Sequence, residues 1–278
     1  MTKRIPVSFE FFPTKTDVGA EKLRVVHQEF PQLNPEFFSV TYGAGGSTRE
    51  RTLAAINDFN GKGTPVAPHL SCIGDDKALI AELLDLYKSQ GIDRIVALRG
   101  DLPSGQVGLG ELPYASDLVT FIREHSGDHF HIEVAAYPEM HPQAESFDQD
   151  IQNFITKARA GANSALTQFF FNPDAYFYFV DRLQKEGVDL PVAPGIMPIT
   201  NASNLIRFAD GTGAEIPRWI RKQLATYGDD SASIKAFGHE VVVKLCERLI
   251  AGGAPSLHFY TMNQTEPNRQ LVLDLGLA

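Results

Sequence analysis

The feature that most constrains the fold is the alternation of strand-like and helix-like segments along the whole sequence. Short apolar runs rich in Phe, Val and Ile are each followed by a segment whose apolar residues recur at helical spacing. Eight such units follow one another without a low-complexity linker, which predicts a parallel sheet covered by helices. Eight parallel strands are also the number that closes into a barrel. The predicted strands are residues 5–12, 37–42, 65–70, 94–99, 131–137, 164–170, 190–194 and 256–260.

A chain of 278 residues is about the usual size of such a barrel. The prediction is therefore one domain over residues 1–278, an α/β fold of the (βα)8 TIM barrel type with extra helices at 216–227 and 230–251 before the last strand. The alternative, a doubly wound open sheet that binds a dinucleotide, would need Gly-x-Gly-x-x-Gly after the first strand. The sequence there is Pro13-Thr14-Lys15, so the barrel is favoured.

Charge, hydrophobicity and cysteine content restrict the partners, the location and the metal chemistry that the sequence allows. A net charge of −9 without a block of Lys or Arg argues against nucleic acid or an anionic membrane as the main partner. No stretch approaches the roughly 18 apolar residues that cross a bilayer, and the amino terminus lacks an apolar signal core, so a cytoplasmic location is expected. Cys72 and Cys246 lie far apart without metal-type spacing, which predicts buried free thiols and no metal site.

Polar side chains gather where the predicted strands end. Ligands of α/β barrels bind at the carboxyl ends of the strands, and closure of the barrel would bring these side chains around one pocket. Reading the same position off successive strands gives Glu10, Thr41, His69, Arg99 with Asp101, Tyr137, Gln168 and Tyr260.

Two carboxylates in this set suit different roles. Glu10 lies between phenylalanines, and apolar surroundings favour a protonated carboxyl that can donate a proton near neutral pH. Asp101 closely follows Arg99, so it should stay ionised and stabilise a cationic ligand or intermediate. Structural explanations stay open beside these roles: Arg99 could neutralise a buried Glu10, His69 could be a core histidine, and Tyr260 could serve packing alone.

Two further polar segments have both a functional and a structural interpretation. The glycine-rich loop 43–47 before a helix could cradle a phosphate or could be a flexible turn. Asp150, Asn153 and Lys157 form a stripe on the helix after the fifth strand, which is either a solvated face or a cofactor contact beside loop 137–142. No lysine occupies a predicted strand end, so a Schiff-base aldolase lacks its nucleophile.

Seven motifs at the ends of the predicted strands are recognisable as a set. They are Ser8-Phe9-Glu10-Phe11-Phe12-Pro13, Ser39-Val40-Thr41-Tyr42-Gly43-Ala44, Ala67-Pro68-His69-Leu70-Ser71-Cys72, Ala97-Leu98-Arg99-Gly100-Asp101-Leu102-Pro103, Ala135-Ala136-Tyr137-Pro138-Glu139-Met140-His141-Pro142, Thr167-Gln168-Phe169-Phe170-Phe171 and His258-Phe259-Tyr260-Thr261-Met262-Asn263. Together they resemble the motifs of bacterial methylenetetrahydrofolate reductases. The resemblance extends from the first predicted strand to the last.

The resemblance implies a barrel that binds FAD at its carboxyl-end face. It implies reduction of 5,10-methylenetetrahydrofolate to 5-methyltetrahydrofolate, with NADH or NADPH as the hydride donor. Folate and nicotinamide would take turns at the flavin, and the product would supply methyl groups for methionine synthesis. A homo-oligomer is expected.

The resemblance also assigns roles to residues. Glu10 would protonate N10 of the substrate as its five-membered ring opens, and Asp101 would lie between the flavin and the pterin. The folate side would comprise Glu10, Asp101, Gln168, Asn204, Phe208, Tyr260 and Gln264. FAD would be held by Thr41, His69, Arg99, Gly100, Asp101, Tyr114, Ala115, Tyr137, His141, Ala144, Asp150, Asn153 and Lys157. Gln264 stands where relatives commonly have Arg, and Asn204 where Gln is frequent, so the contacts to the folate tail depart from the family pattern.

Two other functions are compatible with parts of the sequence. A flavin-free barrel that binds a pterin would share the strand-end acids but not the FAD contacts of the fifth strand and its helix. A degenerate barrel kept for assembly would not catalyse a reaction, and the presence of Glu10, Asp101 and Gln168 together argues against it.

Overall fold

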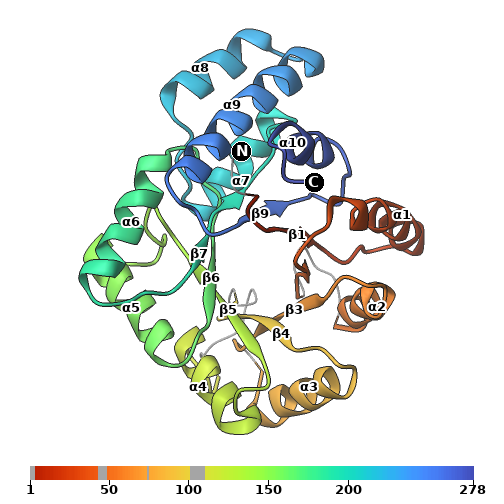
Figure 1. The fold of residues 1–278 in the computed structure, drawn as a ribbon, viewed down its shortest axis with the longest axis vertical. Coiled ribbons are helices and arrows are strands. Elements are labelled where there is room, and N and C mark those ends of the chain that lie inside the picture. The colour runs from red at the N-terminus through yellow and green to blue at the C-terminus, as the bar shows by residue number, and fades with distance from the viewer. Residues whose placement is uncertain (1–3, 43–48, 74, 101–109) are drawn as a thin grey trace.

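The computed structural model describes residues 4–42, 49–73, 75–100 and 110–278, so Asp101 and the glycine-rich loop 43–47 lie outside the described residues. The described residues form a parallel sheet that nearly closes into a barrel, with helices around it, which confirms the predicted fold class (Figure 1). The strands are β1 Val7–Phe11, β2 Phe38–Val40, β3 Val66–Ser71, β4 Arg94–Leu98, β5 His131–Ala136, β6 Ser164–Thr167, β7 Val192–Ala193, β8 Gly195–Ile196 and β9 Leu257–Tyr260. The helices are α1 Asp17–Gln28, η1 Pro31–Leu33, α2 Arg49–Phe59, α3 Lys77–Ser89, α4 Ala115–Ser126, α5 Phe147–Arg159, α6 Pro173–Lys185, α7 Ala202–Thr212, α8 Arg218–Tyr227, α9 Ser231–Ala251 and α10 Asn268–Asp274.

The strand predicted over 190–194 is wrong in its extent, because residues 192–193 form β7 and a second short strand, β8, follows at residues 195–196. The order of strands in the sheet is β7-β6-β5-β4-β3-β2-β1-β9-β8, and its two ends, β7 and β8, are separated in the chain by Pro194 alone. β7 pairs with β6 and β8 pairs with β9, all in parallel. Proline has no N–H for a sheet hydrogen bond, so the chain can change partner at this residue. The two short strands together fill the eighth position of the barrel.

The sheet has an apolar core on each side. Ile95 and Ala97 of β4 belong to the large core between the sheet and the helices. Val96, which lies between them, belongs to a separate small cluster with Phe37, Ala67, Leu166 and Ala193. Successive side chains of a strand point to opposite faces, so this small cluster fills the interior of the barrel. Both cysteines are buried free thiols, as predicted.

The helices surround the sheet, and α8 and α9 project beyond the ring as a pair (Figure 1). These are the predicted extra helices before the last strand. No helix in the described part of the chain is long and apolar enough to cross a membrane. Arg4, the first described residue, lies beside the segment that follows α10, since its Nε donates to the carbonyl of Leu277 at 3.0 Å.

The buried network at the amino ends of β4, β5 and β6 holds this side of the barrel together. Glu133 accepts hydrogen bonds from Arg94 Nη1 at 3.0 Å and from Ser164 Oγ at 2.6 Å. Burial by itself would raise the pKa of Glu133, but hydrogen bonds from His131 and Ser164 and the charge of Arg94 hold that pKa below its ordinary value. Residues at this face of a barrel generally serve stability, so the candidate site lies at the opposite face.

Strands five and six end earlier than predicted. β5 stops at Ala136 and β6 at Thr167, so Tyr137 and Gln168 begin the loops above the barrel. Gln168 N still donates to the carbonyl of Ala136 at 2.8 Å, which places the two loop origins side by side. Both residues therefore face the carboxyl-end surface as functional side chains of barrels do.

Candidate active site

Glu10 is the centre of a buried polar group at the carboxyl end of β1. Its Oε2 lies 3.4 Å from Nε2 of His69 on β3 and 3.8 Å from Nε2 of His258 on β9. Ser8 Oγ is 2.7 Å from the other ring nitrogen of His258, Nδ1. Both histidines are buried, whereas the side chain of Glu10 is 20% exposed. One carboxylate oxygen therefore faces two imidazoles while the group as a whole still reaches the surface of the site.

His69 is neutral around pH 7, because burial lowers its pKa to about 4 despite the nearby carboxylate of Glu10. A neutral imidazole can still donate one N–H. Its Nε2 is buried and has no partner at hydrogen-bond geometry among the described residues. The interpretation of His69 as a core histidine is thus too narrow, since its ring reaches the strand-end acid.

Arg99 does not neutralise Glu10, and that alternative is wrong. Its Nη2 donates to Gln143 Oε1 at 2.5 Å and its Nε donates to the carbonyl of Gly100 at 3.3 Å. Arg99 follows the end of β4, so its side chain extends along the rim towards the loop after β5. The charge of Arg99 therefore lies beside the loop after β5.

Gly100 allows the ends of β3 and β4 to approach closely. Its φ is +84°, and a Cβ built on it would lie 1.9 Å from Ser71 Oγ. Ser71 Oγ itself donates to the carbonyl of Arg99 at 2.8 Å. Only glycine adopts this conformation readily and leaves room for the serine. Any side chain here would displace the segment that leads into Asp101.

The loop after β5 is organised by Asp150 of α5. Asp150 Oδ2 accepts from the backbone N–H of His141 at 2.8 Å, and the carbonyl of His141 accepts from Ala144 N at 2.9 Å. The ring of Tyr137 packs edge-on against the ring of His141, with 4.5 Å between centroids. The structure therefore brings four of the residues predicted to hold FAD into one unit.

The other two members of the α5 stripe differ in environment. Lys157 Nζ donates to the carbonyl of Ala135 at 2.5 Å and lies 5.3 Å from the centre of the Phe154 ring. Burial lowers the pKa of Lys157 to about 8. Asn153 is exposed and accepts from Gln149. The interpretation as a solvated face is thus wrong for Lys157, whose ammonium lies against β5.

Tyr260 extends from β9 to β6. Its hydroxyl donates to the carbonyl of Thr167 at 2.6 Å, and burial raises its pKa well above the ordinary value. Gly195 of β8 lies between them, and its N–H donates to Thr167 Oγ1 at 2.8 Å. Tyr260 therefore does more than fill space, because it ties β9 to the residue before Gln168.

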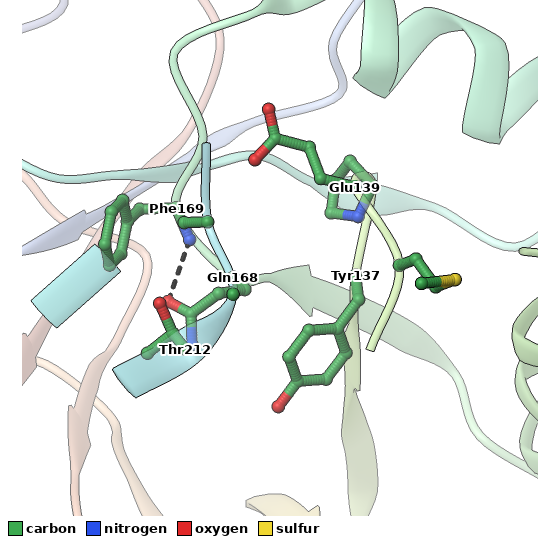
Figure 2. A pocket seen from close by; sticks show the side chains of 9 residues that line it. Tyr137, Glu139, Gln168, Phe169 and Thr212 are labelled. Atoms are coloured by element: carbon green, nitrogen blue, oxygen red, sulfur yellow. Dashed lines mark hydrogen bonds between the residues drawn. The ribbon is translucent and has the colours of Figure 1, made fainter. Parts of the chain in front are cut away.

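A small, open hollow lies between the loop after β5 and the end of α7. Figure 2 shows Tyr137, Gln168 and Thr212 around it, with the side chain of Gln168 turned back so that its Oε1 accepts from Phe169 N at 2.9 Å. Glu139 also lines it. The hollow thus joins one residue predicted to hold FAD and one predicted to bind the pterin.

The remaining predicted site residues are spread around the rim. Thr41 is partly buried and its Oγ1 has no partner among the described residues. Tyr114 is exposed and precedes α4, whose first residue is Ala115. Helix α7 carries Asn204, which is exposed, and Phe208, which is partly buried, and Gln264 is exposed in the loop after β9.

Comparison with known proteins decides the family. A family profile described as methylenetetrahydrofolate reductase matches residues 1–276. The chain is 40% identical over 275 residues to the 5,10-methylenetetrahydrofolate reductase of Escherichia coli (strain K12), covering 99% of this chain and 92% of that protein. The chain belongs to the methylenetetrahydrofolate reductase family. It is accordingly an oxidoreductase enzyme.

A plant relative agrees with this placement, and a solved structure agrees with the fold. The methylenetetrahydrofolate reductase (NADH) 1 of Arabidopsis thaliana is 35% identical over 284 residues, which cover 97% of this chain and 48% of the plant protein. A solved structure from Clostridium thermocellum, described as binding two copies of 5-methyl-5,6,7,8-tetrahydrofolic acid, superposes with a TM-score of 0.69. It covers 99% of this chain and 94% of its own at 15% identity. This likeness supports the fold.

Sequence reasoning missed three residues around this candidate site, namely Ser8, His258 and Glu139. A signal for two of them was present, because side chains two positions apart on a strand share a face. Ser8 precedes Glu10 by two positions, and His258 precedes Tyr260 by two. Glu139 had no such signal, since its partner lies 76 positions away beyond α7.

Proposed function

We propose that the chain reduces 5,10-methylenetetrahydrofolate to 5-methyltetrahydrofolate, using FAD as cofactor and NADH or NADPH as hydride donor in alternating half-reactions. Membership of the family supports the reaction. The observation that carries the residue assignment is Glu10, a partly exposed carboxyl flanked by two buried imidazoles at the face where barrels bind ligands. A purely structural acid would not need an opening to the surface.

The described residues fit an FAD ligand in two respects. Thr41 Oγ1 and His69 Nε2 are buried polar atoms without a hydrogen-bond partner among the described residues, and such atoms need a partner. Gly100 keeps the rim at β4 free of a side chain. When bound, the flavin supplies a carrier for a hydride equivalent. The residues proposed to hold it are Thr41, His69, Arg99, Gly100, Asp101, Tyr114, Ala115, Tyr137, His141, Ala144, Asp150, Asn153 and Lys157.

Glu10 is the proposed general acid for the folate half-reaction. Its Oε2 faces His69 and His258, so Oε1 is the atom available to hold the proton that passes to N10 of the substrate. Protonation allows N10 to leave as a neutral amine when the five-membered ring opens. The two imidazoles lie beside Oε2 at 3.4 and 3.8 Å, and the hydroxyl of Ser8 fixes the ring of His258.

The folate side of the proposal combines several strand ends with α7. Asp101 would stabilise the cation that ring opening produces, since an ionised carboxylate beside it lowers its energy. The hydroxyl of Tyr260 is already bonded to Thr167, so Tyr260 would contribute its ring. The residues proposed on this side are Glu10, Asp101, Gln168, Asn204, Phe208, Tyr260 and Gln264.

The absorption spectrum of the purified protein tests the cofactor, together with oxidation of the reduced form by methylenetetrahydrofolate. We expect a yellow protein that releases FAD and not FMN on denaturation. Colourless protein that cannot be reconstituted with FAD would favour a flavin-free pterin-binding barrel. A flavoprotein whose reduced form folate does not reoxidise would instead favour a degenerate barrel. The proposal also places the protein in the cytoplasm, as a homo-oligomer of one catalytic domain per chain that supplies methyl groups for methionine synthesis.

A further inference from the structure

A single carboxylate joins two loops that are far apart in the sequence. Glu139, in the loop after β5, is half-buried, and its Oε2 accepts from the backbone N–H of Glu215 at 2.8 Å. Glu215 follows α7 and is exposed, but its neighbours Ala214 and Ile216 are buried. The contact therefore anchors the carboxyl-terminal end of α7 to the loop that Asp150 organises.

A close backbone approach lies beside this hydrogen bond. Gly213 ends α7 with a φ of +74°, and a Cβ built on it would lie 2.9 Å from Cγ of Pro142. Met140, between Glu139 and Pro142, has a φ of +81°, which is uncommon for a residue with a side chain. The loop thus adopts a strained turn at the place where it meets α7, as segments at functional sites often do.

Helix α7 buries few of its own side chains, although Ala202 and Phe208 pack partly buried against the core. Of its 11 residues, Leu205 and Ala209 are buried. A helix with so few buried apolar side chains gains little from packing, and such elements open locally at low free-energy cost. The contacts at the end of the helix therefore contribute to the positions of Asn204 and Phe208.

The two joined elements belong to different halves of the proposed site. The loop carries Tyr137 and His141 on the side proposed for FAD, and α7 carries Asn204 and Phe208 on the side proposed for folate or nicotinamide. The hollow between them is lined by Glu139 as well (Figure 2). A change in the distance between these elements would change the width of the space that both substrates have to enter.

We propose that Glu139 is a positioning residue, which fastens α7 to the loop after β5 and so sets the spacing between the two halves of the active site. The assignment of the halves rests on the proposed function, whereas the fastening itself does not. Burial raises the pKa of Glu139 to about 7, although the N–H of Glu215 opposes this shift. Above that pH the carboxylate is ionised, and its hydrogen bond is charge-assisted and stronger than a neutral one.

The test compares Glu139→Ala with Glu139→Gln at pH 8, and Glu145→Ala, at an exposed position of the same loop, is the matched control. Glutamine keeps an acceptor for Glu215 N, and alanine removes it. Hydrogen exchange measured over residues 202–216 should become about tenfold faster in Glu139→Ala and stay near wild type in the other two variants. In steady-state assays, the KM for folate and for nicotinamide should rise about fivefold or more in Glu139→Ala with kcat within about twofold, and Glu139→Gln should restore both values.

Unchanged exchange over 202–216 in Glu139→Ala would overturn the fastening whatever the activity. Faster exchange with unchanged KM would overturn the positioning role and leave a contact of structural importance alone. If exchange is faster in Glu139→Ala as expected but the wild-type protein does not reduce folate, the proposed function is overturned and the fastening is supported. Loss of kcat alone, with KM unchanged, would also contradict positioning, because it would place Glu139 among the catalytic residues.

Discussion

His27 should make this barrel unstable in mild acid. The imidazole lies in α1, is 2% exposed, and stacks on the ring of Phe59 with 3.8 Å between centroids. Phe11 and Phe38 meet it edge-on, and neither ring nitrogen has a hydrogen-bond partner among the described residues. Burial, which disfavours the charged imidazolium, lowers its pKa to about 4.

The sign of the effect follows from proton binding in the two states. Below pH 6.5 the unfolded chain binds a proton at this histidine, whereas the folded protein does so only near its pKa of about 4. The free energy of unfolding therefore falls as the pH falls from 6.5 towards 4. The loss due to His27 is about 2 kcal/mol at pH 5 and reaches roughly 3 kcal/mol below pH 4, at ~1.4 kcal/mol for each tenfold change in proton affinity.

The variant His27→Leu removes this ionisation from the core. At pH 7.5 its stability should lie within about 1 kcal/mol of wild type, because leucine is of similar size and the two unpaired nitrogens are gone, but the ring contacts with the phenylalanines are lost. The stability of the variant minus that of wild type should increase by about 2 kcal/mol when the pH is lowered from 7.5 to 5. Urea unfolding followed by circular dichroism at both pH values measures this difference.

Two results would refute the reasoning about His27. Parallel pH dependences of wild type and His27→Leu would show that the imidazole is protonated in the folded protein without penalty. An equal gain at pH 5 from the control His239→Gln, whose Nε2 lies 2.8 Å from Oδ2 of Asp274 and whose ring is only partly buried, would show that the effect is not specific to the buried ring. His69 remains in all these proteins, so its own pH dependence cancels from the comparison.

Three further outcomes are expected. Glu10→Gln should leave hydride transfer from nicotinamide to flavin within about tenfold of wild type while slowing folate reduction ~10²–10⁴-fold; stopped-flow traces showing an equal loss of both half-reactions would make Glu10 a structural residue. Gln264→Arg should tighten binding of the anionic folate tail by roughly 1–3 kcal/mol before screening, which an unchanged KM at low salt would contradict. Glu133→Gln should cost roughly 1–3 kcal/mol of unfolding free energy because it weakens the buried hydrogen bonds from Arg94 and Ser164, although Arg94 keeps its ion pair with Glu36 at 2.7 Å, and an unchanged midpoint of urea unfolding would show that the network adjusts.

Periodicity along the sequence determined the architecture. Alternating strand and helix patterns record which side of each element is buried, and that information is local. The barrel, its extra helices before the last strand and the row of strand-end residues followed from these patterns, and motif resemblance added the family. Glu10 was identified as the candidate acid from its apolar neighbours in the sequence alone.

The partners of these residues were decided only when the strands closed. Ser8 and His258 are 250 positions apart yet 2.7 Å from one another, because β1 pairs with β9 in a register that places Ser8 beside His258 and Glu10 beside Tyr260. Register and closure depend on all strands at once, so no single segment encodes them.

The same limit explains the remaining differences. Lys157 looked like part of a solvated stripe because helical spacing tells which residues share a face, but not which backbone carbonyl a long side chain can reach. The change of partner at Pro194 and the bond from Glu215 to Glu139 likewise depend on elements distant in the chain. The sequence by itself therefore determined the alternation of strands and helices and the candidate residues near the strand ends. The tertiary structure decided which side chains meet there, because hydrogen bonds act over about 3 Å while sequence patterns specify only direction.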